Sequence, residues 1–214
     1  MKKNILVIAF GVAAMLMMSI PTQVSAQKLS SKEKSAIKKL AKKWENDGFR
    51  VTSLAFSMEE KIADFRMKIK SNPDLVELTS EGEGKSSFSA EMAAQNAAAL
   101  QYATAAGSII QGGIEREFGN IGEDYDKFHG SYIQDVAKYI MPLLHKEMTF
   151  SKKEAGIYYV KVGYTLSEER ASEVREKAFD EALNEQQKTI KNGQDFGLKV
   201  RKYVKENVNP LKEE

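Results

Sequence analysis

The sequence predicts an α+β fold in which long helices pack on one face of a small, mainly antiparallel sheet. A stretch from Ser86 to Phe118 is rich in alanine, the residue with the highest intrinsic helix propensity, and predicts a long central helix. Residues 146–152 and 157–166 predict a hairpin whose second strand carries one continuous apolar row. That row consists of Tyr158, Val160, Val162, Tyr164 and Leu166. We expect the central helix to lie against this row and to form the middle of the core.

The first residues have the three parts of a secretory signal peptide. Two lysines follow the initial methionine, residues 5–20 are apolar, and small residues come next. The predicted cleavage site consists of Val24, Ala26 and Gln27. Because the apolar run is shorter than a bilayer span, we expect removal of residues 1–26 and a periplasmic or secreted mature chain. No cysteine follows the apolar run, so we expect no lipid anchor at this terminus.

Composition excludes several classes of function for residues 27–214, a length that suits one ordinary domain. Removing residues 1–26 takes away two of the 32 basic residues and none of the 30 acidic ones, so the net charge falls near zero. This balance argues against nucleic acid as the partner, because domains that bind it are usually markedly basic. The chain has no cysteine, which excludes disulfides and thiolate metal sites.

Residues 27–48 predict a basic amphipathic helix that begins at Ser30 or Ser31 and ends at Gly48. Its apolar face consists of Ile37, Leu40, Ala41 and Trp44. Its lysines are Lys32, Lys34, Lys38, Lys39, Lys42 and Lys43. Lys32, Lys38, Lys39, Lys42 and Lys43 are candidate contacts to an anionic envelope surface. The competing interpretation, which a charged outer face favours, is a terminal helix that docks on the core through its tryptophan.

The α+β domain is expected over residues 49–192. It begins with an extended segment, 49–56, a helix over 58–70 and a short strand over 75–79, and the glycine-containing segment 80–84 is expected to turn into the central helix. A helix that is small-sided in its middle and bulky at its ends can lie close against a neighbouring layer, and we expect this alanine-rich rod to be buried flat against the apolar row of the second hairpin strand. Larger apolar side chains recur along it at helical spacing. These residues are Phe88, Met92, Leu100, Ile110, Ile114 and Phe118.

Two more helices follow the central one. Aromatic and branched residues at helical spacing predict a core helix over 125–143. Ser167 is expected to cap a helix whose first turn carries Glu168 and Glu169, which suit the positive end of the helix dipole. Residues 193–214 are a charged tail that predicts a last short helix before Pro210.

Motifs for chemistry are weak, and we predict no catalytic residue, no metal ligand and no cofactor. Gly84-Lys85-Ser86 resembles the end of a phosphate-binding loop, but Thr79 stands where that motif needs glycine. His129 with Asp126 supplies two candidate metal ligands where zinc needs at least three, and His145 is expected at the end of a helix. Ser35 and Lys38 match the spacing of a serine–lysine nucleophile without its companion motifs. Paired carboxylates leave a hydrolase as an alternative.

Several segments resemble small exported proteins of Gram-negative envelopes. These segments are WENDGF at 44–49, EGEG at 81–84, the alanine-rich helix and the strand IYYVKVGYTL. Over about residues 44–185 the chain is similar to the Lpp-twenty family of envelope lipoproteins, and more closely to uncharacterised exported proteins of Bacteroidota. The resemblance implies an α+β domain in the periplasm or at the outer membrane that serves interaction or assembly. The family's lipidated cysteine is missing, which leaves membrane anchorage open.

The sequence therefore predicts a non-catalytic exported module that binds a protein or an envelope surface. It predicts no nucleic-acid partner and no transmembrane segment in the mature chain. The alternatives are a carboxylate-dependent hydrolase of the periplasm and an amphipathic binder of anionic surfaces.

Overall fold

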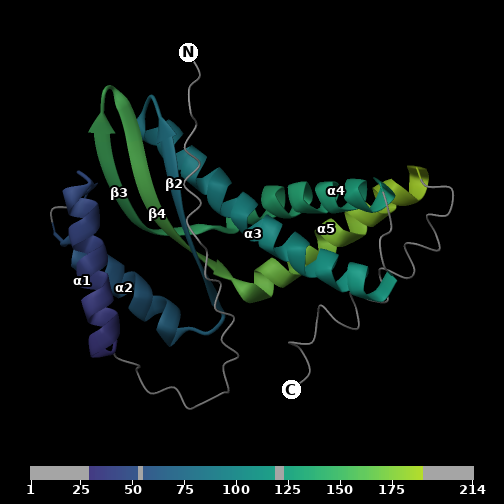
Figure 1. The fold of residues 1–214 in the computed structure, drawn as a ribbon, viewed down its shortest axis with the longest axis horizontal. Coiled ribbons are helices and arrows are strands. Elements are labelled where there is room, and N and C mark those ends of the chain that lie inside the picture. Colours follow the sequence, from purple (N-terminus) through teal and green to yellow (C-terminus); the bar gives the residue numbers. More distant parts are fainter. Residues whose placement is uncertain (1–28, 53–54, 119–122, 190–214) are drawn as a thin grey trace.

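The computed structural model describes residues 29–52, 55–118 and 123–189. Within these ranges five α-helices and a four-stranded antiparallel sheet follow one another along the chain (Figure 1). The helices are α1 (Ser31–Asn46), α2 (Met58–Ser71), α3 (Ser87–Phe118), α4 (Glu123–Ile140) and α5 (Glu168–Thr189), with a 3-10 turn η1 (Met141–Leu143) after α4. The strands are β1 (Arg50–Val51), β2 (Leu75–Gly84), β3 (His145–Glu154) and β4 (Ile157–Ser167), in the spatial order β1-β3-β4-β2.

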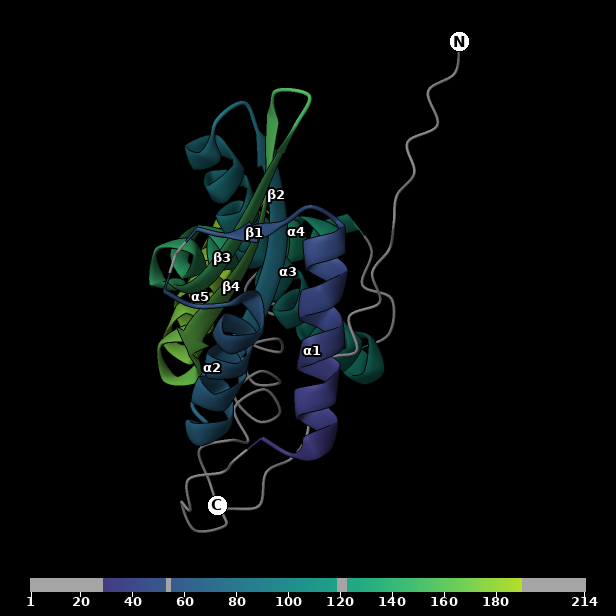
Figure 2. The same ribbon diagram turned by 90° about the vertical axis from the view of Figure 1, so that its left-hand side faces the viewer.

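The α+β class and the antiparallel sheet are confirmed, and the helices cover both faces of the sheet where one face was expected. Alternate residues of β4 point to opposite faces. Val160, Val162, Tyr164 and Leu166 face α3 and the helices behind it, as predicted. On the other face a Cβ at Gly163 would meet Met148 and the Phe65 ring of α2. This second face was not predicted, because a glycine in a strand carries no hydrophobic signal. Figure 2 shows α1 and α2 on the opposite side of the sheet from α3.

The β3–β4 hairpin that the sequence predicts is confirmed, with Glu154 paired to Ile157 at its tip. Its two-residue turn is Ala155-Gly156, in which both residues have positive φ angles of 49° and 82°. Turns of this kind match the right-handed twist of the strands that they join.

Strand β2 is twice as long as predicted, because the segment expected to be a turn continues the strand to Gly84. Gly82 pairs with Val160 and Gly84 with Tyr158, so both glycines lie on the face that α3 covers. A Cβ at Gly82 would overlap the backbone of Ala90 and Ala94, and one at Gly84 would overlap Ser89. The glycines therefore let an alanine-rich helix lie directly on the strand, since neither side supplies a long side chain.

The central helix is confirmed, and its alanine side is buried against the sheet as expected. The residues that fill the core are small, with the exceptions of Tyr102 and Ile110. They are Ala90, Ala94, Ala98, Ala99, Tyr102, Ala103, Ala106 and Ile110. Of the larger apolar residues at helical spacing, Ile110 is buried, whereas Phe88, Met92 and Leu100 are exposed. Contact with the glycine side of β2 leaves no space for them, so the larger side chains lie outside. Ile114 and Phe118 lie among residues whose side chains the structure does not describe.

Beyond the sheet, α3, α4 and α5 form a helical arm with an aromatic core (Figure 1). Phe128 and Tyr132 of α4 are fully buried and lie edge-on to Phe179 of α5. Where α4 crosses α3, a Cβ at Gly107 would collide with Ile133 and His129. The predicted aromatic core helix over 125–143 is thus confirmed, and so is the predicted helix after Ser167.

On the opposite face, α1 and α2 pack on β3 and close a second core. Trp44 of α1 lies with its ring centroid 5.4 Å from that of Phe150. Both helices begin with a capping box, in which a serine hydroxyl and a glutamate three residues later satisfy each other's backbone N–H groups. Ser30 was predicted from the sequence as a cap, and the structure confirms it.

Some predictions fall outside the described ranges. The cleavage site at Val24, Ala26 and Gln27 and the tail 193–214 lie there. His145, expected at the end of a helix, instead begins β3, because η1 ends the helical segment at Leu143. In the part of the chain that the structure describes, no helix is long and apolar enough to span a membrane.

Candidate interaction surface

Exposed, uncharged residues recur along α3 at four-residue spacing, in a row that winds round the helix by about 40° at each step and that we call the α3 ridge. Its members are Phe88, Met92, Asn96, Leu100, Thr104, Ser108 and Gly112, and all of them are exposed. The exposed fractions are 75% for Phe88, 37% for Met92 and 53% for Leu100. Ile109, 58% exposed, lies beside the ridge. Rows at this spacing are the ridges that pack into the grooves of another helix.

The α3 ridge differs from an ordinary water-facing helix surface because it has no charge. No Asp, Glu, Lys or Arg occurs between Glu91 and Glu115. Helices on the surface of soluble proteins normally place charged residues on the side away from the core. Four of the seven large apolar side chains that are exposed among the described residues lie on this one helix. Such a concentration marks an interaction surface more often than scattered single residues do.

Polar bonds from α3 to its neighbours fix which side of the helix faces out. The Ser80 hydroxyl of β2 donates to the carbonyl of Ala94 at 2.7 Å. The Gln95 amide donates to the carbonyl of Met141 in η1 at 2.9 Å. Together with the close contact at Gly82, these bonds hold the alanine side of α3 on the sheet. The α3 ridge is therefore presented to solvent by a rigidly seated helix.

The predicted anionic-surface contacts lie where the sequence placed them. Lys32, Lys38, Lys39, Lys42 and Lys43 are all exposed along α1. The apolar side of the same helix is engaged, because Ile37 and Ala41 are buried in the core with α2. A helix that lies in a membrane interface must insert its apolar face. In the described fold α1 can therefore offer only charge to an anionic surface.

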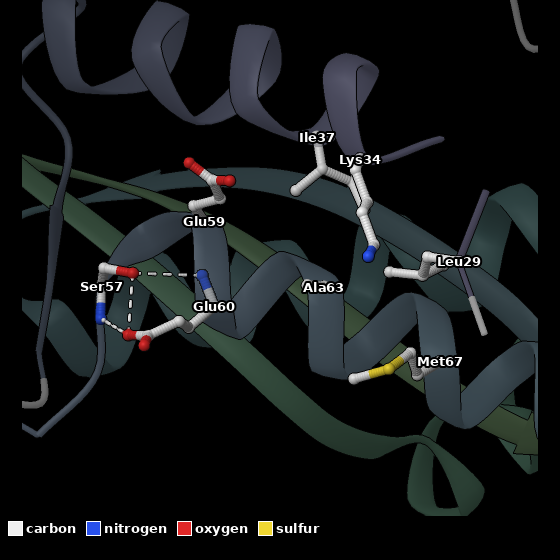
Figure 3. Close-up of a pocket in the computed structure, with 8 residues that line it drawn as sticks. All are labelled: Leu29, Lys34, Ile37, Ser57, Glu59, Glu60, Ala63 and Met67. Carbon is white, nitrogen blue, oxygen red and sulfur yellow. Dashed lines mark hydrogen bonds between the residues drawn. The ribbon is translucent and has the colours of Figure 1, made fainter. Parts of the chain in front are cut away.

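A cavity of about 520 Å³ lies between α1 and α2 (Figure 3). Its apolar lining comes from Leu29, Ile37, Ala63 and Met67, and its polar lining from Lys34, Ser57, Glu59 and Glu60. Glu60 is committed to the start of α2, where it accepts hydrogen bonds from the backbone and hydroxyl of Ser57. These bonds lower the pKa of Glu60 and keep it ionised. Two of the four polar residues that line the cavity, Ser57 and Glu60, thus serve the helix cap.

A second cavity, of about 240 Å³, is lined by Glu91, Lys146 and Glu147 among others. Glu147 stands at the irregularity between Lys146 and Met148 in β3. One of its oxygens accepts bonds from Lys68 at 2.5 Å and from the buried Thr165 hydroxyl at 2.7 Å, and lies 3.0 Å from Nδ1 of His145. Partial burial opposes ionisation, but the hydrogen bonds from Lys68 and Thr165 outweigh it and lower the pKa of Glu147. A carboxylate held in this way is a poor proton donor.

The weaker candidates from the sequence do not come together. His129 is partly buried against α3 at Gly107, while Asp126 on the same helix is exposed. Among the described residues, no three histidines or carboxylates gather as metal ligands would. Ser35 and Lys38 lie exposed on α1, and Gly84 is part of β2.

Comparison of the chain with protein-family models, curated proteins and solved structures found no match. The resemblance to Lpp-twenty lipoproteins therefore stays a prediction, as do the export and the anionic-surface contacts. The α3 ridge was missed because the whole helix was predicted as the middle of the core, and no exposed side was distinguished on it. The signal that could have revealed it is the alternation of Ser80, Gly82 and Gly84 in the preceding strand. Small residues at every second position of a strand indicate a backbone or small-residue contact on that face.

Proposed function

We propose that this chain is an exported, non-catalytic interaction or assembly module of the cell envelope or the secreted fraction. The α3 ridge is its binding surface, and the observation that carries the proposal is the absence of charge along this exposed row. An exposed, rigid helix face without charge gains free energy when a matching apolar surface excludes water from it. The partner expected on these grounds is a protein, because the polar members of the ridge require hydrogen-bonding groups opposite them.

The hydrolase alternative has less support from the described residues. It requires carboxyl groups with raised pKa values that converge in a cavity. Burial raises the pKa of Glu77, and burial together with Glu181 raises that of Asp135. These two residues lie on β2 and α4, and neither lines the two cavities described above. Glu77 also accepts a salt bridge from Arg66, which favours a structural role.

The test is a cross-linking pull-down from envelope and culture-supernatant extracts, with the mature chain as bait. The first bait is unmodified, the second carries Leu100→Glu with Ile109→Glu, and the matched control carries Glu173→Lys on the exposed side of α5. We expect proteins that the unmodified and control baits capture and that the ridge variant loses. If all three baits capture the same proteins, or none, the α3 ridge is not a binding surface and the proposal fails.

A second candidate function is supported by the exposed lysines of α1. Because the apolar side of α1 is buried, binding to anionic surfaces would be electrostatic and would weaken steeply with salt. The measurement is co-sedimentation with vesicles of phosphatidylglycerol and phosphatidylcholine at low and high salt. Replacement of Lys32, Lys38, Lys39, Lys42 and Lys43 by glutamine should abolish binding at low salt, and equal binding by both forms would exclude this function.

A further inference from the structure

We propose that the cavity between α1 and α2 binds a short peptide of two or three residues that has apolar side chains and free termini. Lys34 holds the carboxylate of this peptide, and Glu59 holds its ammonium group. The inference goes beyond the proposed function, because the α3 ridge takes no part in it. It follows from two opposite charges that the fold leaves without a partner at the two ends of an apolar cavity.

The middle of the cavity is apolar and suits side chains without charge. Leu29 and Ile37, both buried, line one side, and Ala63 and Met67 of α2 line the other. The volume of about 520 Å³ falls within the range of about 300–1,000 Å³ that is usual for sites of small ligands. The cavity can therefore take up apolar side chains and remove them from water, which favours binding.

Polar bonds fix the two walls of the cavity in the absence of a ligand. Lys70 at the end of α2 donates to both carboxylate oxygens of Glu33 at the start of α1, each at 3.1 Å. The two helices therefore run antiparallel and are joined at this end. Their starts are held by the capping boxes of Ser30 with Glu33 and of Ser57 with Glu60. A site with walls that are already fixed needs little ordering when a ligand enters it.

Lys34 and Glu59 are the two polar residues of the lining that the helix cap leaves over. Both are exposed, and neither side chain forms a hydrogen bond or an ion pair with another residue in the described part of the chain. Figure 3 shows Lys34 near Leu29, whereas Glu59 lies at the other end of the cavity beside Ser57. A positive and a negative charge are thus available at opposite ends of the apolar space.

The separation of these two charges matches the length of a short peptide. Lys34 points to the part of α2 that carries Ala63 and Met67 (Figure 3). Glu59 stands four residues before Ala63 and eight before Met67, which corresponds to roughly 6–12 Å at a rise of about 1.5 Å per residue. An extended peptide spans about 3.3–3.6 Å per residue, so two or three residues cover this distance. Each terminus then forms a charge-assisted hydrogen bond.

Charge complementarity favours a peptide over a fatty acid, which also combines an apolar body with a carboxylate. A fatty acid would satisfy Lys34, but its tail would lie against the unpaired carboxylate of Glu59. That carboxylate would lose water without gaining a partner, which is unfavourable. A peptide brings an ammonium group to the same place.

Isothermal titration calorimetry of the mature chain tests this assignment with the peptides Leu-Leu and Leu-Ala-Leu as probes. We expect binding, and we expect N-acetylated or C-amidated forms to bind at least about tenfold more weakly, because each lacks one charged hydrogen bond. Lys34→Gln should bind the free and the amidated peptide equally, and Glu59→Gln should bind the free and the acetylated peptide equally. The matched controls Lys127→Gln on α4 and Glu173→Gln on α5, both exposed, should bind as the unmodified chain does.

Ala63→Leu supplies a second measurement, because the larger side chain fills the cavity. It should weaken binding of the peptides at least about tenfold, with circular dichroism to confirm that the variant is folded. The proposal is overturned if neither peptide binds at millimolar concentration, if blocking the termini has no effect, or if laurate binds more tightly than the peptides. Equal binding by Ala63→Leu would also overturn it. The proposed function survives any of these results, since the pull-down depends on the α3 ridge and the titration does not.

Discussion

Two tyrosines in the helical arm differ in the hydrogen bonding of their hydroxyl groups: the hydroxyl of Tyr102 has a hydrogen-bond partner, and that of Tyr132 has none within the described part of the chain. Tyr102 accepts a hydrogen bond from Arg175, whose guanidinium also donates to Glu168 at 2.5 Å. Burial raises the pKa of Tyr102 to about 12, so its hydroxyl stays neutral. Tyr132 is fully buried, and its hydroxyl has no hydrogen-bond partner among the described residues. Its ring contributes to the core while its oxygen is desolvated without compensation.

We therefore expect the two hydroxyls to respond oppositely to removal. Tyr132→Phe should leave the free energy of unfolding unchanged or raise it by up to about 1 kcal/mol, because an uncompensated polar group disappears. Tyr102→Phe should lower it by about 1.5–3 kcal/mol, because a bond to a charged group in a partly buried site is lost. Urea unfolding of both variants is the measurement. A substantial loss of stability in Tyr132→Phe would contradict this, and would indicate a buried water on its oxygen.

Glu33 gives a prediction about pH. Hydrogen bonds from the Ser30 side chain and backbone lower the pKa of this carboxyl from 4.5 to about 2. Because the folded pKa lies below the unfolded one, the cap stabilises the fold above pH 4.5 and loses this effect as the pH falls toward 2. Ser30→Ala should raise the pKa of Glu33 toward 4.5, as measured by NMR titration of its carboxyl group. An unchanged titration curve would show that the Ser30 hydroxyl does not hold this carboxylate, and that the backbone N–H of residue 30 and Lys70 are sufficient.

At the scale of elements, the contact between α3 and β2 depends on residues that lack side chains. Gly82→Ala would push a methyl group into the backbone of Ala90 and Ala94, which cannot move without shifting the whole helix. We expect a loss of about 3 kcal/mol in the free energy of unfolding. Gly130→Ala in α4 is the matched control, because its Cβ would meet nothing and alanine favours a helix by up to about 1 kcal/mol. Similar effects in both variants would contradict the role assigned to Gly82.

The sequence predicted the elements well where one residue type signals one structure. Capping serines, helical periodicity in α2, α4 and α5, and the alternating row of β4 each identified an element correctly. The errors came from contacts between elements. The glycines of β2 were predicted to form a turn. Within one segment, a glycine that ends a strand cannot be distinguished from a glycine that lets a neighbouring helix approach the strand closely. The alanine side of α3 lies inside as expected, but the exposure of Phe88, Met92 and Leu100 was not predicted, because it depends on the glycines of β2 that leave space only for small residues.

The candidate surface was therefore not predictable from α3 alone. When the whole helix is predicted as the middle of the core, nothing in its sequence indicates an exposed row. The exposed lysines of α1 were predictable, because an alternation of charged and apolar residues already separates the two sides of a helix. A candidate binding surface can be predicted from the sequence when it is strongly charged. It is missed when it consists of ordinary uncharged residues.

At the scale of the whole molecule, the two hydrophobic cores lie on opposite faces of one sheet. β4 contributes Val160 and Val162 to the core with α3, and β3 contributes Met148 and Phe150 to the core with α1 and α2. Because β3 and β4 are hydrogen-bonded to each other along their length, we expect the two cores to unfold together. Differential scanning calorimetry of the unmodified mature chain should show a single transition whose calorimetric and van't Hoff enthalpies agree. Two resolved transitions would show that the layer of α1 and α2 melts on its own.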